Sequence, residues 1–319
     1  MSSQAQFRGF HTSARYGNLP SLMDMVDYAA AQGFNRMILR FDDGMEIAGA
    51  PWVPLPGALP EADVQYLIDH AISVGIKVIP ELKLLTHQDK FFKDTSPKML
   101  FNLETYNTTP TSPKNNPYPI VKSLILKVLA MTKAKQLHIG HDELCGAVGG
   151  TGFCLLPGQT MLPAAEFLKD TLKLHNFLKL QGVRTFMWAD MLESWEEFPT
   201  MLNRNFHGSN PYTHKVNAGY GKALRDQLPK DIVIIPFHYK ETGTEFPNLA
   251  QFVLEGFTVL GATWMTSANI INQPAYAATH GVNGMIATTW TQVTARNLED
   301  IIKPILKSTG TQFKINFPN

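Results

Sequence analysis

Cysteine is nearly absent from this sequence: Cys145 and Cys154 are the only two in 319 residues. So few cysteines exclude a disulfide framework and a zinc site built from cysteine. No stretch approaches the roughly 18 consecutive apolar residues that a membrane-spanning helix needs. An excess of one charge is also lacking, because 28 Lys and Arg residues stand against 27 Asp and Glu. We therefore expect neither a nucleic acid nor a membrane as a partner.

The first residues lack the pattern of a secretion signal. Residues 1–6 contain no basic stretch followed by an apolar core. Together with the scarcity of cysteine, this favours a cytoplasmic protein with reduced thiols, although a chain whose leader had been removed would look the same.

The composition is that of a folded protein with a large core. Hydrophobic residues make up 44% of the chain and charged residues 17%, which is not a disorder signature. We find no internal repeat, low-complexity tract or domain-splitting linker. The sequence therefore predicts a single domain over residues 1–319.

Apolar runs with strand and helix periodicities take turns along the chain. The expected strands are Phe7–His11, Arg36–Phe41, Lys77–Leu82, Leu137–Gly140, Thr185–Trp188, Ile232–Phe237, Thr258–Ala262 and Gly284–Thr289. The expected helices are Leu19–Gln32, Glu61–Val74, Tyr118–Thr132, Ala164–Leu180, Asn248–Leu254, Ala268–Thr279 and Leu298–Leu306. Eight strands, seven of them followed by a helix, predict an α/β fold, a (β/α)8 TIM barrel, rather than an open doubly wound sheet. An open sheet would more often carry a glycine-rich phosphate loop after its first strand, and residues 10–14 are not one.

Two adjacent acids, Asp142 and Glu143, follow the fourth expected strand in the stretch His138-Ile139-Gly140-His141-Asp142-Glu143. Successive side chains of a strand face opposite ways, so both acids can reach one ligand only if the chain leaves regular pleating there. The glycines that follow, Gly146, Gly149, Gly150 and Gly152, would allow that departure. The alternative is an ordinary solvated pair of acids at a strand end.

In a barrel of this kind, chemistry is expected at the carboxyl ends of the strands. The residues near those ends are rich in acids, histidines and tryptophans, the last being Trp188, Trp264 and Trp290. Carboxylates can bind hydroxyls or move protons, and aromatic faces stack on the C–H surface of a sugar ring. This combination indicates a sugar site.

The stretch at 138–143 resembles the His-x-Gly-x-Asp-Glu signature of family 20 glycoside hydrolases, the β-N-acetylhexosaminidases, and in particular their compact, hexosaminidase D-like branch. Four further segments resemble motifs of that family in the same order: Arg8-Gly9-Phe10-His11, Val78-Ile79-Pro80-Glu81 with His87, Phe186-Met187-Trp188-Ala189-Asp190-Met191, and Thr289-Trp290-Thr291-Gln292. The resemblance extends over most of the chain.

The resemblance implies a mechanism without an enzyme nucleophile, in which the acetamido oxygen of the substrate attacks the anomeric carbon. Glu143 would be the general acid and base, and Asp142 would orient the acetamido group and stabilise its positive charge. The substrate would be an oligosaccharide or glycoconjugate with a terminal β-linked N-acetylhexosamine. The family needs no cofactor or metal, and a homodimer stays open.

Supporting roles follow from the same resemblance. Tyr239 would bind the acetamido oxygen, and Trp188, Trp264 and Trp290 would wall the pocket. Arg8 would bind sugar hydroxyls. His138, Glu81 and His87 would position the acidic pair. Asp190 would either bind a hydroxyl or cap the following helix.

The chain departs from the family pattern in three places. Gln292 stands where many members carry a Glu that binds the sugar hydroxyls at C4 and C6, so selectivity at C4 and tolerance of substrate charge are open. Leu84-Leu85-Thr86 precedes His87 where a Gly often does. We also expect the small β-domain that precedes the barrel in many members to be missing, as it is in the hexosaminidase D-like branch. The sequence does not decide between gluco and galacto substrates.

Two other functions remain in view. A metal-dependent barrel hydrolase could use His11, His138, His141 and Asp142, but it would want a His-x-His pair on the first strand, where only His11 occurs. A sugar-binding barrel without catalysis is the other, and the retained Asp-Glu pair argues against it.

Overall fold

The structure, a computed structural model, describes residues 6–14, 17–41, 45–46, 57–88, 105–144, 162–193, 197–201 and 218–318. Its centre is a parallel sheet with the strand order β10-β11-β1-β2-β5-β6-β7-β8-β9. The strands are β1 (Phe7–Ser13), β2 (Arg36–Arg40), β5 (Lys77–Leu84), β6 (Gln136–Gly140), β7 (Arg184–Trp188), β8 (Val233–Ile235), β9 (Thr258–Val259), β10 (Gly261–Thr263) and β11 (Gly284–Thr288). Two short strands, β3 (Met45–Glu46) and β4 (Leu59–Pro60), pair with each other outside this sheet.

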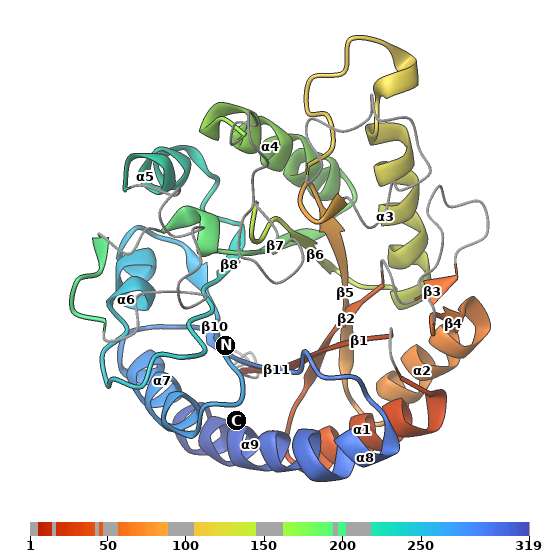
Figure 1. The fold of residues 1–319 in the computed structure, drawn as a ribbon, viewed down its shortest axis with the longest axis vertical. Coiled ribbons are helices and arrows are strands. Elements are labelled where there is room, and N and C mark those ends of the chain that lie inside the picture. Colours follow the sequence, from red (N-terminus) through yellow and green to blue (C-terminus); the bar gives the residue numbers. More distant parts are fainter. Residues whose placement is uncertain are drawn as a thin grey trace.

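The sheet closes on itself because β9 and β10 are two pieces of one strand. Leu260 alone separates them, and its backbone N–H donates to Ile234 O at 3.1 Å. β9 pairs with β8, while β10 pairs with β11, which in turn pairs with β1. A bridge between Phe237 and Ala262 joins the chain after β8 to β10 as well. The result is a (β/α)8 barrel, as the alternation in the sequence predicts, with the strands forming the inner ring of Figure 1.

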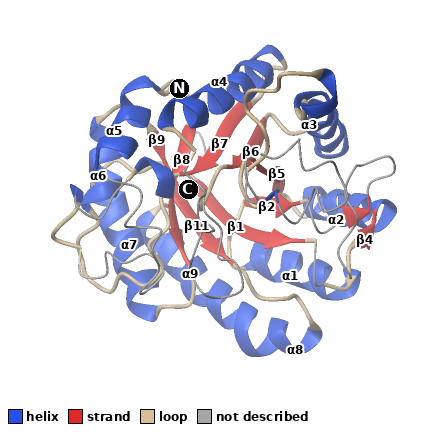
Figure 2. Cartoon of the chain, turned by 45° about the horizontal axis from the view of Figure 1, so that its top comes forward, coloured by secondary structure: helices blue, strands red, loops and turns tan. Residues whose placement is uncertain are grey.

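Helices surround the ring of strands (Figure 2). They are α1 (Leu19–Ala31), α2 (Glu61–Ser73), α3 (Tyr118–Thr132), α4 (Ala164–Leu180), α5 (Ala218–Gln227), α6 (Pro247–Leu254), α7 (Ser267–Thr279), α8 (Ala295–Asn297) and α9 (Lys303–Asn316). Among the described residues, no helix is long and apolar enough to span a bilayer.

Local sequence explains where several helices begin and end. The Asn18 side chain accepts from Ser21 N at 2.9 Å and so caps α1. Gly33, Gly75 and Gly182 follow α1, α2 and α4 with φ of +88°, +84° and +67°, a conformation that suits glycine. Each of these glycines marks the point at which the chain leaves its helix.

The structure differs from the expected elements in several places: β3 and β4 were not expected, α9 continues past Leu306 to Asn316, and two further differences concern helices. The sequence predicted no helix between Trp188 and Ile232, and α5 lies there, because its glycines and polar residues gave a weak helical pattern. The last expected helix, Leu298–Leu306, starts with π-helical turns at Leu298–Ile302 before α9. Pro304 lies in the first turn of α9, where its missing backbone N–H is tolerated.

The core has two layers. Most buried apolar side chains pack between the outer face of the strands and the helices. A smaller cluster fills the inside of the barrel and consists of Ile38, Ile79, Phe186, Trp188, Val233, Ile235, Phe237, Leu260, Ala262 and Ile286. Tyr239 and Trp290 pack against this inner cluster and rise above it. The filled interior therefore forms a floor at one end of the barrel.

Candidate active site

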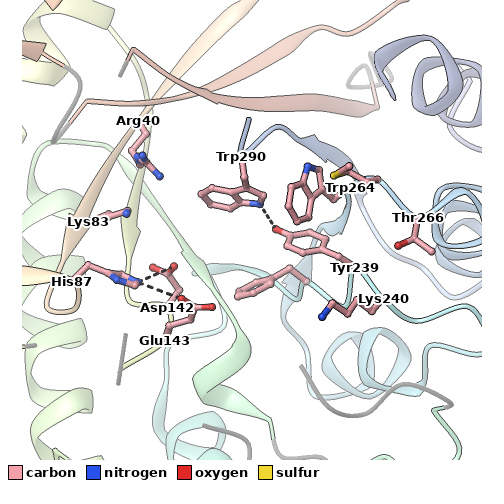
Figure 3. A pocket seen from close by; sticks show the side chains of 12 residues that line it. Arg40, Lys83, His87, Asp142, Glu143, Tyr239, Lys240, Trp264, Thr266 and Trp290 are labelled. Carbon is pink, nitrogen blue, oxygen red and sulfur yellow. Dashed lines mark hydrogen bonds and ion pairs between the residues drawn. The ribbon is translucent and has the colours of Figure 1, made fainter. Parts of the chain in front are cut away.

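A cavity of about 490 Å³ opens at the carboxyl ends of the strands (Figure 3). Arg40 ends β2, Lys83 lies near the end of β5, and Asp142 and Glu143 follow β6. The complete lining consists of Arg40, Lys83, His87, Asp142, Glu143, Phe237, Tyr239, Lys240, Trp264, Met265, Thr266 and Trp290. This is the end of a barrel at which catalytic residues are expected.

The backbone leaves strand geometry directly after β6. Gly140, His141 and Glu143 have φ of +73°, +68° and +46°, all in the left-handed region. Consecutive side chains no longer alternate there, so Asp142 and Glu143 both line the cavity. The glycines at 146, 149, 150 and 152, which the sequence offered as the cause, lie outside the described residues. The turn is already present in residues 140–143.

His87 faces both acids from the loop after β5. Its Nε2 lies 3.4 Å from Asp142 Oδ2 and 3.8 Å from Glu143 Oε2. Burial alone would raise the pKa of Asp142, but the charge and contact of His87, with a further contribution from Lys83, hold that pKa well below its usual range. Asp142 is therefore a carboxylate at neutral pH.

Asp190 fixes the backbone of Glu143 from the end of β7. Its Oδ2 accepts a hydrogen bond from Glu143 N at 2.7 Å. Burial raises the pKa of Asp190 well above its ordinary value, and the nearby charge of Asp142 raises it further. Asp190 does not appear in the cavity lining, so its contact here is with the acidic pair.

Glu81 lies beneath the cavity as the hub of a buried network. One carboxylate oxygen is 2.7 Å from His11 Nε2, and the other accepts from Trp188 Nε1 at 2.9 Å and lies 3.6 Å from His138 Nδ1. Burial opposes ionisation of Glu81, but His11 and His138, with Arg40, lower its pKa to about 2. Burial lowers the pKa of His138 to about 4. The floor thus holds a carboxylate beside a neutral imidazole.

An aromatic wall faces the acids across the cavity (Figure 3). Trp290 Nε1 donates to the Tyr239 hydroxyl at 3.2 Å, and Tyr239 meets Trp264 edge to face with ring centroids 5.7 Å apart. Phe237 stacks on Tyr239 at 5.3 Å. Burial raises the pKa of Tyr239, so its hydroxyl stays protonated. One phenol therefore remains a hydrogen-bond donor in an apolar wall.

The structure brings most of the expected site residues to this place. Asp142, Glu143, His87, Tyr239, Trp264 and Trp290 line the cavity, while Glu81, His138 and Trp188 are fully buried below it. Trp188 packs against Trp290 with centroids 6.0 Å apart and so supports the wall from beneath. It does not itself appear in the lining.

Two expected residues lie elsewhere. Arg8 is near the amino end of β1, where its Nε donates to Gly33 O at 2.8 Å and its Nη1 to Phe317 O at 3.0 Å. This contradicts the prediction that Arg8 binds sugar hydroxyls in the cavity. The first residues of each parallel strand lie at the end of the barrel opposite to the cavity. Gln292 is exposed, does not line the cavity, and its backbone carbonyl accepts from Asn297 Nδ2 at 3.1 Å.

Three cations of the cavity were not among the residues expected from the sequence. Arg40, Lys83 and Lys240 all line it, and the Arg40 guanidinium lies 5.8 Å from the centroid of a Trp290 ring. Arg40 was inside an expected strand and Lys83 one residue past another. Their position at strand ends was the signal that could have singled them out.

The residues considered for a metal site are not brought together. His11 is paired with Glu81, and His141 Nε2 lies 3.0 Å from Asp170 Oδ2 on α4. Within the described part of the chain, the group that could hold a cation is instead His87, Asp142 and Glu143, whose ligand atoms lie within 4.8 Å of one another.

Comparisons with known proteins agree with this architecture. Among solved structures, the chain resembles Flavobacterium johnsoniae chitobiase (TM-score 0.65, 16% identity, 96% of this chain and 48% of that one). It also resembles dispersin B, with a TM-score of 0.60 and 17% identity over 99% of this chain and 100% of that one. A third likeness is to an exo-β-N-acetylglucosaminidase of Vibrio harveyi, with a TM-score of 0.65 and 14% identity over 98% of this chain and 55% of that one. The chain spans about half the length of the chitobiase and of the Vibrio enzyme.

At these identities the likenesses show the fold alone. No curated protein sequence matches the chain. The model of glycosyl hydrolase family 20, catalytic domain, however, matches residues 16–306, which is most of the sequence. The chain therefore belongs to glycoside hydrolase family 20, and the cavity lies within its catalytic domain.

Proposed function

We propose that this protein is a retaining exo-β-N-acetylhexosaminidase that removes terminal β-linked N-acetylglucosamine or N-acetylgalactosamine with the help of the substrate's own acetamido group. The observation that carries the proposal is the pair Asp142 and Glu143 on one wall of a cavity whose opposite wall is aromatic. The aromatic wall suits the C–H face of a sugar ring. Adjacent acids can serve two neighbouring atoms of one sugar, the anomeric carbon C1 and the substituent on C2.

In the first step Glu143 donates its proton to the glycosidic oxygen while the bond from C1 to that oxygen breaks. The acetamido oxygen forms a new bond to C1 and gives an oxazolinium ion, and the aglycone leaves as an alcohol. Asp142 is suited to stabilise the positive charge on the acetamido nitrogen, because His87 and Lys83 keep it ionised. The Tyr239 hydroxyl is a protonated donor for the acetamido oxygen.

In the second step the Glu143 carboxylate takes a proton from water, and the water oxygen attacks C1. The bond from C1 to the acetamido oxygen breaks, which restores the acetamido group and the β configuration. Glu143 ends protonated, as it began. The hydrogen bond from Glu143 N to Asp190 keeps this residue in its left-handed conformation through both steps.

The test measures hydrolysis of a 4-nitrophenyl N-acetyl-β-hexosaminide and of a β-linked N-acetylglucosamine disaccharide, in both gluco and galacto forms. We expect turnover by the wild type, and a fall in kcat of about 100- to 10,000-fold in Glu143→Gln. That loss should be larger for the disaccharide, whose leaving group needs the proton. Wild-type rates in Glu143→Gln would contradict the assignment.

Asp142→Asn and an oxazolinium mimic test the part played by the acetamido group. Asp142→Asn should lower kcat more than it weakens substrate binding, because the charge it removes is needed when the acetamido group becomes positive. An N-acetylglucosamine thiazoline should bind far more tightly than free N-acetylglucosamine. Equal binding of the two compounds would rule out substrate assistance.

Two further outcomes would point to other functions. Loss of turnover in a chelator, with recovery on adding a divalent cation, would favour a metal at His87, Asp142 and Glu143. Binding of the sugar without any turnover would favour a non-catalytic sugar-binding barrel.

A further inference from the structure

His141 stands directly before the catalytic pair but does not face the cavity. Its φ of +68° is in the left-handed region, which costs a residue with a side chain about 1–2 kcal/mol relative to the right-handed one. The side chain is fully buried, and its ring meets Phe167 of α4 edge to face at 5.3 Å. Something must hold this residue in place if the turn that presents Asp142 and Glu143 is to persist.

Two oxygen atoms hold the ring of His141. Nδ1 lies 3.0 Å from Ile139 O, and Nε2 lies 3.0 Å from Asp170 Oδ2. Both contacts lie at a site from which water is excluded, because the side chains of His141 and Asp170 have 0% exposure.

Asp170 also receives two phenols. The Tyr106 hydroxyl lies 3.0 Å from both carboxylate oxygens, and the Tyr118 hydroxyl donates to Oδ1 at 2.7 Å. Burial, and then the charge of Asp170, raises the pKa of each tyrosine, so both remain donors. The carboxylate on α4 is thus satisfied by three different segments of the chain.

One of these segments leads to His87. Tyr106 N donates to Leu85 O at 3.3 Å, and Leu85 and His87 have φ of +69° and +58°. Asp170 therefore connects the two irregular segments that face each other in the cavity: the end of β6 with both acids, and the loop after β5 with His87.

We propose that Asp170 is a positioning residue: through His141 it holds the left-handed turn that directs Asp142 and Glu143 into the cavity. This inference rests on the proposed function for its kinetic readout. It differs from that function in that Asp170 touches neither the substrate nor the reacting atoms.

Glycine provides the sharpest test, because it adopts a positive φ without a side chain to be held. We expect Asp170→Asn to lower kcat about 10-fold with little change in KM, and His141→Ala to do the same. We expect His141→Gly to stay within about threefold of the wild type. In the His141→Gly background, adding Asp170→Asn should cost no further kcat.

A matched control comes from the same helix. The Nε2 atom of His175, on α4, lies 3.3 Å from Asp231 Oδ1. Asp231 lies just before β8, so this contact is near the amino ends of the strands, opposite to the end that carries the acids. Asp231→Asn alters a histidine contact of similar length, together with a surface ion pair to Lys179, and should leave kcat unchanged. A 10-fold loss in this control, equal losses in His141→Ala and His141→Gly, or an Asp170→Asn effect that persists beside His141→Gly would each overturn the proposal. The proposal would also be overturned if Asp170→Asn lowered the midpoint of thermal unfolding but left kcat unchanged.

Crystal structures of the same variants separate this inference from the proposed function. If the wild type has no hexosaminidase activity, the proposed function fails, but the geometry remains testable. Asp170→Asn or His141→Ala should then shift residues 140–143 and lengthen the 3.4 Å contact between His87 and Asp142, and His141→Gly should not. If Asp170→Asn does not fold, the comparison of alanine with glycine at 141 decides. An unshifted turn in His141→Ala would overturn the proposal.

Discussion

At the scale of single residues, the floor of the cavity holds two groups whose ionisation is set by burial and by each other. Glu81 remains charged because His11, His138 and Arg40 lower its pKa by more than burial raises it. His138 Nδ1 accepts a hydrogen bond from Gly140 N at 3.0 Å, which requires that this nitrogen carry no proton. The neutral imidazole therefore supports the backbone at the start of the left-handed turn.

This arrangement predicts that acid destabilises the protein in two stages. The pKa of His138 falls from 6.5 to about 4 on folding, so the unfolded chain takes up the proton first and stability is lost as the pH falls through that interval. Glu81, with its pKa lowered from 4.5 to about 2, adds a loss at lower pH. The His138 contribution is at most about 3 kcal/mol.

The measurement is the midpoint of thermal unfolding between pH 7 and 4 for the wild type and for His138→Asn, whose side-chain oxygen can still accept from Gly140 N. The variant loses packing at every pH, so we compare how steeply the midpoint falls with pH in the two proteins, and not the midpoint itself. A shallower slope in the variant is expected. Parallel slopes would mean that His138 is not the group that titrates.

At the scale of elements, the irregular pairing of β5 with β6 shapes the site. Glu81 pairs with His138 and Leu84 with Gly140, so three steps along β5 match two along β6. Such a bulge turns the side chains beyond it toward new directions. Here it places Glu81 under the cavity and lets the chain after Gly140 begin the turn that carries both acids.

A side chain at Gly140 would be crowded by the backbone of β5 at this bulge. A Cβ there would lie 3.1 Å from Lys83 Cα, 3.2 Å from Leu82 O and 3.3 Å from Leu84 N, all backbone atoms of β5. Gly182, with φ +67°, has open space around it. Gly182→Ala should therefore cost only the backbone strain of about 1–2 kcal/mol. Gly140→Ala should cost more and also lower kcat.

Chemical denaturation and kcat for the two variants check this prediction. Because both glycines have similar φ, the difference between them isolates the contact with β5. Equal destabilisation, or an unchanged kcat in Gly140→Ala, would show that the bulge can yield without moving the acids.

Elements with strong periodicity could be predicted from the sequence, while the irregular joints could not. Tyr118–Thr132 and Ala164–Leu180 have the expected bounds because their apolar positions recur every three or four residues. The bulge at Glu81 and the split at Leu260 leave no trace in such patterns, since both depend on how neighbouring strands pair. Asp170 was likewise invisible, because an acid in an amphipathic helix is expected to be solvated.

At the scale of the whole molecule, the two arginines near β1 and β2 show why a motif can indicate a fold and still misplace a function. Arg8 joins parts of the chain 309 residues apart by donating to Phe317 O, and so ties the first strand to the end of α9. Arg40, which the sequence analysis did not single out, lies in the cavity beside Trp290. Which end of a strand a residue occupies decides between these roles, and a single motif does not carry that information.

Arg8→Met and Arg40→Met should therefore change different quantities: the first the free energy of unfolding, the second KM. Arg8→Met removes two hydrogen bonds from a charged donor at the closed end of the barrel, and each such bond contributes about 1.5–3 kcal/mol. We expect a clear loss in the free energy of unfolding with KM within about twofold of the wild type. Arg40→Met should raise KM about 10-fold or more, because a cation that lines the cavity is lost. Denaturant unfolding and steady-state kinetics on an N-acetyl-β-hexosaminide measure both quantities. A raised KM with unchanged stability in Arg8→Met would contradict this assignment and return the residue to the sugar site.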